Sequence, residues 1–221
     1  MAGFHPRPEE LPSAFPIFPL ARALLLPQGR LPLNIFEPRY VAMVEDVLGQ
    51  HRMFGMIQPD AQAVETEHGP GLFRVGCLGR LSAFSETEDG RYLITLTGVI
   101  RFRFCEELGV RRGYRRARAD FSPYGDDLDL APHPIGIDRE TLLDALRSYF
   151  AARSFEANWE AIGAMRDDVL VATLCMVCPF DPAEKQALLE AATDADRAAS
   201  LLALLRMGQH DPSDGPHGPV S

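Results

Sequence analysis

The sequence predicts an α+β protein in which an N-terminal curled antiparallel β domain with one helix precedes a C-terminal helical bundle. Before residue 122, apolar and polar residues alternate along several segments, which is the pattern of half-buried strands. After residue 137, apolar residues recur at a spacing of three and four, which indicates helices. Hydrophobic residues make up 46% of the 221-residue chain, which is enough for a packed core.

Shifts in composition predict the domain boundaries. Residues 15–121 form the predicted β domain, and residues 138–207 form the helical subdomain. Residues 122–137 are the predicted linker, because prolines and an acidic cluster replace the periodic pattern there. The two ends, 1–14 and 208–221, carry no periodic pattern, and we expect both to be loose.

Prolines determine the first elements. Residues 15–26 form two short apolar segments punctuated by prolines, so we expect edge strands, where a missing N–H group is tolerated. Residues 31–40 predict a strand that turns into a helix at Pro38, whose fixed φ suits the first helical position. Glu37 precedes this helix at the positive end of its dipole, and Gly49 is placed to end it.

Two further strands follow this helix. Residues 53–57 predict a strand buried on both faces. Residues 73–83 alternate between apolar and polar, which predicts a half-buried strand with Cys77 pointing inward. The pair Asp89-Gly90 then indicates a hairpin turn.

The strand after the hairpin is long for a flat sheet. One apolar face continues over residues 92–104 and is broken only at Gly98. A glycine at such a position is typical of a strand that bends or accepts a close backbone. A turn at residues 109–113 then leads into a last strand, residues 114–121.

Beyond the linker the pattern is helical throughout. The first helix has one apolar face, formed by Leu142, Leu143, Leu146, Tyr149 and Phe150. Residues 167–178 are apolar nearly all round, which predicts a central, buried helix. The run Asp181-Pro182-Ala183-Glu184 and the box from Thr193 to Asp196 predict the starts of the last two helices.

Two blocks of the N-terminal half carry a family resemblance. Residues 15–20 read Phe-Pro-Ile-Phe-Pro-Leu, and residues 31–40 read Leu-Pro-Leu-Asn-Ile-Phe-Glu-Pro-Arg-Tyr. Together they resemble the signature of the N-terminal, substrate-binding domain of the ATP-dependent protease Lon, which also occurs in stand-alone proteins. Residues 76–79 with 98–102, and residues 185–190, fit the same family. The resemblance spans about residues 15–207 and implies a PUA-like pseudo-barrel that binds polypeptides.

The catalytic modules of Lon need lysines that this sequence lacks. Lys185 is the one lysine of the chain, and Glu184 precedes it inside a predicted helix. A phosphate-binding loop requires Gly-Lys followed by Ser or Thr, and a serine-lysine dyad requires a lysine beside the nucleophile. We expect Lys185 to lie exposed on a helix face. The prediction is therefore a chain that is not an enzyme.

Metal and redox chemistry are also weakly supported. Cys175 and Cys178 lie in the most apolar helix, where buried, unreactive thiols are the expected outcome. The six histidines are scattered, with no two at ligand spacing. We therefore expect no metal site and no cofactor, and four reduced cysteines.

A dense run of arginines opens one alternative function. Seven arginines lie from Arg101 to Arg118. The fold that the Lon resemblance implies is related to a barrel that RNA-binding modules also use. The candidate phosphate or RNA contacts are Arg111, Arg112, Arg115 and Arg116. Against this, Arg101 and Arg103 are predicted on the solvent side of an alternating strand, and the turn arginines can pair with acids of the helical part. The net charge of -9 also disfavours nucleic acid, so an ion-paired face is the favoured interpretation.

The strand-to-helix corner is the candidate contact surface for a peptide or partner. It contains Phe36, Glu37, Arg39 and Tyr40. The plainer interpretation, which we favour, is that Glu37 caps the helix, Tyr40 packs, and Arg39 pairs with a neighbouring carboxylate. An enzyme of unrecognised type, with a site at the junction of the two domains, stays a further alternative.

The leading hypothesis is a non-catalytic, Lon-like module that binds unfolded or partner polypeptides. No apolar run approaches the roughly 20 residues that span a bilayer, and no signal segment is apparent, so we expect a cytoplasmic protein without membrane contact. Edge strands and the helical face could each support a homodimer.

Overall fold

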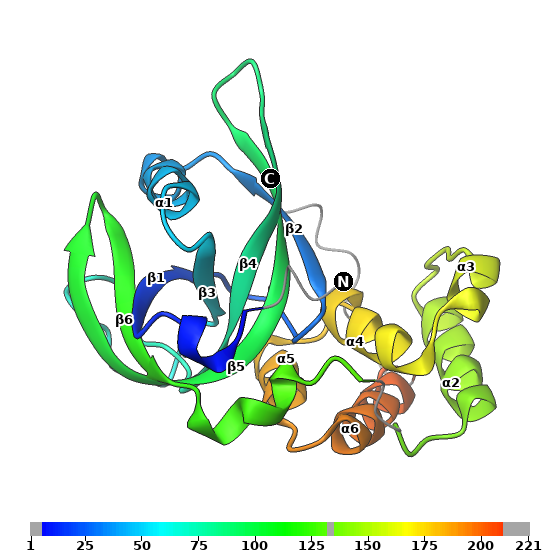
Figure 1. Cartoon of the computed structure of the whole chain (residues 1–221). Helices are drawn as coiled ribbons and strands as arrows, with labels where there is room; N and C mark the ends of the chain where they lie inside the picture. The colour runs from blue at the N-terminus through cyan, green and yellow to red at the C-terminus, as the bar shows by residue number, and fades with distance from the viewer. Residues whose placement is uncertain (1–5, 132–134, 210–221) are drawn as a thin grey trace.

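The computed structural model describes residues 6–131 and 135–209 of the chain (Figure 1). It is a mixed α+β fold with a six-stranded sheet. The elements in chain order are η1 (Pro8–Glu10), β1 (Ala14–Pro19), β2 (Arg30–Ile35), α1 (Pro38–Leu48), β3 (Met53–Ile57), β4 (Val75–Glu86), β5 (Tyr92–Arg111), β6 (Tyr114–Asp120), η2 (Ser122–Leu128), α2 (Arg139–Ala152), α3 (Trp159–Ala164), α4 (Asp167–Val177), α5 (Pro182–Glu190) and α6 (Asp194–Met207), where η marks a 3-10 helix.

The sheet closes on itself. Its strand order is β2-β5-β4-β3-β1-β6, and β5 also pairs with β6, so that five strands form a ring with β2 outside it. The sequence pattern predicts antiparallel pairing only, whereas β1 and β3 pair in parallel. The reason is that the chain crosses over through β2 and α1 before it returns as β3. Figure 1 shows helices α2 to α6 gathered at one end of the sheet and α1 apart from them.

The expectation of edge strands near the N-terminus is wrong. β1 lies between β3 and β6, but each half of it pairs on one side only. Residues 14–16 pair with β6, and residues 17–19 pair with β3. Proline is tolerated at Pro16 and Pro19 because the backbone at each position pairs with a strand on one side only. Residues 20–26 form no strand, although Leu24, Leu25 and Leu26 are buried.

The long strand β5 joins the two halves of the sheet. Its first part pairs with β2 and β4, and its last part pairs with β6. Gly98 accepts a close backbone, as the sequence predicts: its carbonyl oxygen accepts a hydrogen bond from the Gln28 N–H (2.9 Å), and its own N–H donates to the Gly29 oxygen (2.8 Å). The strand continues beyond the predicted end to Arg111, and the turn follows at Arg112 and Gly113.

Local signals give the bounds of the first helix correctly. α1 begins at Pro38 with Glu37 at the N-cap position, and Gly49 follows its last residue. β4 differs from its prediction, because residues 75–79 are buried on both faces rather than one. The additional cover comes from α5, whose Gln186 side chain donates to the Val75 carbonyl oxygen (3.0 Å). Cys77 is buried as expected.

The helical part confirms the predicted caps. Asp181 and Glu184 form a capping box at the start of α5, and the Thr193 hydroxyl accepts a hydrogen bond from the Asp196 N–H at the start of α6. The short helix α3 was not predicted. No helix in the described ranges is long and apolar enough to cross a membrane.

Part of the predicted linker forms a 3-10 helix. Residues 122–128 form η2, which lies against β5. One cluster of buried side chains includes Leu26 and Met43 from the N-terminal half and Leu142 and Leu201 from the helices. The β part and the helices therefore share a continuous core, and the division at residues 122–137 stays a prediction.

Candidate groove between the sheet and the helices

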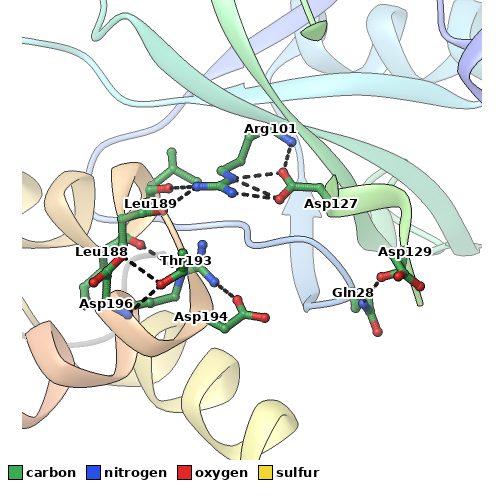
Figure 2. Close-up of polar contacts among 11 residues, drawn as sticks. Gln28, Arg101, Asp127, Asp129, Leu188, Leu189, Thr193, Asp194 and Asp196 are labelled. Carbon is green, nitrogen blue, oxygen red and sulfur yellow. Dashed lines mark hydrogen bonds and ion pairs between the residues drawn. The ribbon is translucent and has the colours of Figure 1, made fainter. Parts of the chain in front are cut away.

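A groove of about 790 Å³ lies where the start of β2, η2, α4 and the turn between α5 and α6 meet. Residues 26–30 form one wall, and residues 126, 127, 129 and 131 form a second. The side of α4 forms the floor, and the rest of the lining comes from residues 192–195 together with Arg101, Ile135 and Arg197. Figure 2 shows the polar side chains around it, with Gln28 and Asp129 on one side and Thr193 and Asp194 on the other.

The floor is a partly exposed apolar stripe on α4. Val169, Ala172, Met176 and Val177 line the groove together with Thr173. Their spacing places them on one face of the helix. Val169 is 46% exposed and Val177 is 64% exposed, although most other apolar residues of α4 are buried. The prediction of a central, buried helix is therefore wrong on this side, because Val169 and Val177 are exposed, although Met176 between them is buried under residues 26–30.

The second wall is held by a buried ion pair between Arg101 and Asp127 (Figure 2). The Nε and Nη2 atoms of Arg101 donate to the Asp127 carboxylate over 2.8 to 3.2 Å. Its Nη1 atom donates to the carbonyl oxygens of Leu189 (3.2 Å) and Ala191 (2.6 Å), and Tyr124 lies with its ring centroid 4.8 Å from the guanidinium carbon. Arg101 thus joins β5, η2 and the end of α5.

The position of Arg101 corrects the sequence analysis, which placed it on the solvent side of the strand. It is 6% exposed, because η2 folds back over this face of β5. Arg103, two residues on, is exposed as expected. Burial alone would lower the pKa of Arg101, but the hydrogen bonds to Asp127 and the negative charge of Asp127 together outweigh it and raise the pKa above the usual value.

A second buried arginine lies at the opposite wall. Arg197 on α6 donates from Nε to the Leu188 carbonyl oxygen (3.0 Å) and pairs with Asp194. Both buried arginines therefore bind acceptors of this chain. The two arginines therefore hold the walls of the groove in place, and their hydrogen-bond donors are occupied by acceptors of this chain.

Aspartates outnumber arginines in the lining. The described residues that line the groove include five aspartates, Asp126, Asp127, Asp129, Asp168 and Asp194, and three arginines, Arg30, Arg101 and Arg197. Ion pairs join Asp127 to Arg101, Asp168 to Arg166 and Asp194 to Arg197. Asp126 is exposed at the rim. The groove therefore combines an apolar floor with an acidic rim.

The predicted corner residues lie outside this groove. Phe36 is 49% exposed, and Glu37 and Arg39 form an ion pair of 2.8 Å at the surface. Tyr40 is buried against Phe18, with ring centroids 4.2 Å apart. Packing of Tyr40 and pairing of Arg39 follow the plainer interpretation, but the Glu37 side chain binds Arg39 instead of capping the helix. A partner contact at this corner stays a prediction.

Three of the four candidate arginines for RNA, Arg111, Arg112 and Arg115, bind acids of this chain. Arg111 lies 3.2 Å from Asp46, and Arg112 lies 2.7 Å from Glu45, so that both contact α1. Arg115 is buried and donates to Glu107 of β5 (2.6 Å). Arg116 is half-buried. The paired acids come from α1 and β5, whereas the sequence analysis expected them from the helical part.

Lys185 is buried, which contradicts the expectation of an exposed side chain. It is 4% exposed, and its Nζ atom donates to the Met176 carbonyl oxygen (2.8 Å) near the end of α4. The sequence pattern does not predict this burial. The helix α5 lies between the sheet and α4, so that it is covered on both sides. Burial lowers the pKa of Lys185, and the nearby Cys178 and Cys175 thiols counter part of that effect.

A Lys185→Met variant is expected to remove a pH-dependent part of the stability. Because the folded pKa lies below the usual value of 10.5, the unfolded chain binds more protons between these two values. The stability of the wild-type protein should therefore rise relative to the variant as pH increases through this window. Urea unfolding of both proteins at several pH values between about 7 and 10 measures the difference. A difference that does not change with pH would contradict the burial of a titrating amine.

The thiols match their predicted environment. Cys175 and Cys178 are buried, and burial raises the pKa of each to about 12. Within residues 6–131 and 135–209, no group of three or more His, Cys, Asp or Glu side chains is arranged to hold a metal ion.

The fold belongs to a known structural class. A solved Lon N-terminal domain protein from Xanthomonas campestris superposes with a TM-score of 0.55 at 22% identity, covering 86% of this chain and 97% of the other. The N-terminal domain of Mycobacterium avium complex Lon protease gives a TM-score of 0.56 at 12% identity, covering 87% and 97%. The six-stranded sheet with its helices is therefore similar to Lon N-terminal domains.

Sequence comparison gives the family. The family model of the ATP-dependent protease La (LON) substrate-binding domain matches residues 14–207, and the chain belongs to this family. Lon protease 2 of Sorangium cellulosum is 32% identical over 109 residues, which are 49% of this chain and 13% of that protein. Protein cereblon of Danio rerio is 28% identical over 131 residues, which are 56% of this chain and 29% of that protein. The match covers the substrate-binding domain of Lon, not its peptidase or ATPase domains.

Proposed function

We propose that the chain is a non-catalytic, Lon-type module that binds exposed apolar segments of unfolded or partner polypeptides. The observation that carries this proposal is the family match over residues 14–207, which covers a domain that the family name describes as substrate-binding. The stand-alone function and the cytoplasmic location are part of the same proposal.

The architecture supports the proposal in two respects. The strand ring formed by β5, β4, β3, β1 and β6 is consistent with a PUA-like pseudo-barrel. Helices α2, α4, α5 and α6 contribute buried apolar residues to one core, which is consistent with a C-terminal bundle beginning near residue 138. A groove at the junction of two such parts is a common location for a binding site.

The contacts of the structure favour binding over catalysis. The guanidinium groups of Arg101 and Arg197 are hydrogen-bonded to Asp127, Asp194 and backbone carbonyls. Pairing of Arg111, Arg112 and Arg115 with acids of this chain likewise weakens the RNA alternative.

Two further parts of the proposal concern contacts. The proposed contacts for the polypeptide remain Phe36, Glu37, Arg39 and Tyr40. A homodimer also remains a proposal. The free edge of β2 carries Pro32, which lacks the N–H group that strand addition requires.

Binding of a denatured protein tests this function. A fluorescently labelled, reduced and carboxymethylated model protein is titrated with the full chain, and its anisotropy is followed. We expect saturable binding of the denatured form and none of the native form of the same protein. Absence of saturable binding, by a sample whose fold is confirmed by circular dichroism, would contradict the proposal.

A further inference from the structure

We infer that the groove over α4 holds an apolar polypeptide segment that carries a basic side chain beside its apolar residues. This inference rests on the proposed function and adds a location and a chemical preference to it. Three features of the groove support it: its partly exposed apolar floor, its fixed walls and its acidic rim.

The floor provides the apolar contact. Val169 and Val177 are 46% and 64% exposed, and they lie on the same side of α4 as Ala172 and Met176. Covering these two partly exposed valines removes apolar surface from water, which favours binding of an apolar side chain. An apolar stripe that lies inside a groove is also shielded from general surface contacts, which suits an inserted side chain.

The walls are held in place before binding. A Cβ atom added to Gly29 would overlap the Met176 sulfur and lie 3.0 Å from the Leu26 oxygen, so residues 26–30 lie directly on α4. The Gln28 side chain also approaches the Asp129 carbonyl oxygen (3.4 Å) across to η2 (Figure 2). The volume of about 790 Å³ falls within the usual range of about 300–1,000 Å³ for pockets of small ligands, which suits a few side chains. Pre-formed walls reduce the entropy that binding costs.

The rim selects a positive partner. The described lining carries two more aspartates than arginines, five against three. Arg101 and Arg197 are neutralised by Asp127 and Asp194, and Asp168 is paired with Arg166 outside the lining, so the accessible negative charge lies at the rim. Asp126 is exposed, so its carboxylate is accessible to a basic side chain. The net charge of -9 adds long-range attraction for a basic segment. The same charge disfavours a second copy of this chain as the occupant.

Three labelled peptides test the preference on the full chain. The first has a central apolar run flanked by arginines, the second has the same run flanked by glutamates, and the third keeps the arginines but replaces the apolar run with serines. We expect the first to bind at least tenfold more tightly than either of the others, and its affinity to fall as salt increases. Equal affinities for the first two peptides, or for the first and third, would overturn the inference.

Variants locate the site. Val169→Asn with Val177→Asn should weaken the first peptide at least tenfold, whereas Val64→Asn, at an exposed position outside the groove, should leave it unchanged. Asp126→Asn should reduce the preference for arginine over glutamate flanks about threefold. Glu88→Gln in the β4–β5 turn is its matched control, without expected effect. All these positions are exposed, and thermal unfolding confirms that each variant is folded.

The outcomes separate the location from the function. If the groove variants bind as the wild-type chain does while Phe36→Ala weakens binding, the site lies at the strand-to-helix corner and the groove inference is wrong. If denatured protein binds the wild-type chain and all groove variants alike, the proposed function stands and the inference falls. If the wild-type chain binds no denatured protein and no peptide, both fall.

Discussion

Replacing Gly98 with alanine is expected to destabilise the protein by about 3 kcal/mol. The added Cβ atom would overlap the Leu26 carbonyl oxygen and lie 2.7 Å from its carbon and 3.2 Å from the Pro27 Cα atom. These are backbone atoms, so no side-chain rotation relieves the overlap. The backbone hydrogen bonds of Gly98 to Gln28 and Gly29 would have to lengthen or break, which separates residues 26–30 from β5.

Gly109 provides a control in the same strand. A Cβ atom added there meets no atom within 4 Å, so Gly109→Ala should change the stability by less than about 0.5 kcal/mol. Urea unfolding followed by circular dichroism measures both variants. Equal stabilities of the two variants would show that β5 and residues 26–30 are not in the close contact described here.

Replacing Arg101 with methionine is expected to destabilise the protein by about 3–5 kcal/mol. The variant would leave the buried Asp127 carboxylate without its cation and would remove the donor for the Leu189 and Ala191 carbonyl oxygens. Uncompensated buried charge, rather than lost packing, dominates this cost, because methionine retains most of the side-chain volume. The loss should also loosen η2, which forms a wall of the groove.

Arg103→Met is the matched control, since Arg103 lies in the same strand and is exposed. Its stability should stay within about 0.5 kcal/mol of the wild-type value. A double variant, Arg101→Met with Asp127→Leu, should recover part of the loss, because neither charge is then left alone. A double variant less stable than Arg101→Met would contradict the ion-pair explanation. Urea unfolding of all three proteins provides the comparison.

Features determined by short-range chemistry could be predicted from the sequence. Pro38 and Gly49 gave the bounds of α1, because proline and glycine constrain the backbone wherever they occur. Asp89-Gly90 gave the hairpin, and the capping boxes gave the starts of α5 and α6. Gly98 was predicted as a point of close backbone approach, although the sequence did not show which segment approaches it.

Burial that depends on elements distant in the sequence could not be predicted. The alternation of β5 places Arg101 on one face, but only the fold shows that η2 covers that face. Lys185 was expected to be exposed for the same reason, because its cover comes from the sheet and from α4. The apolar run of α4 predicted burial on all sides, since sequence does not distinguish a core face from an uncovered binding face. The sequence therefore could not predict the groove, because the groove depends on the exposed side of α4.

The central claim is that this chain holds polypeptides without changing them. Isolation of its complex with a denatured model protein by size-exclusion chromatography, followed by mass spectrometry of the released polypeptide, tests the claim most directly. We expect a stable complex whose released polypeptide has its original mass. Absence of a complex, or release of cleaved or modified polypeptide, would contradict the claim.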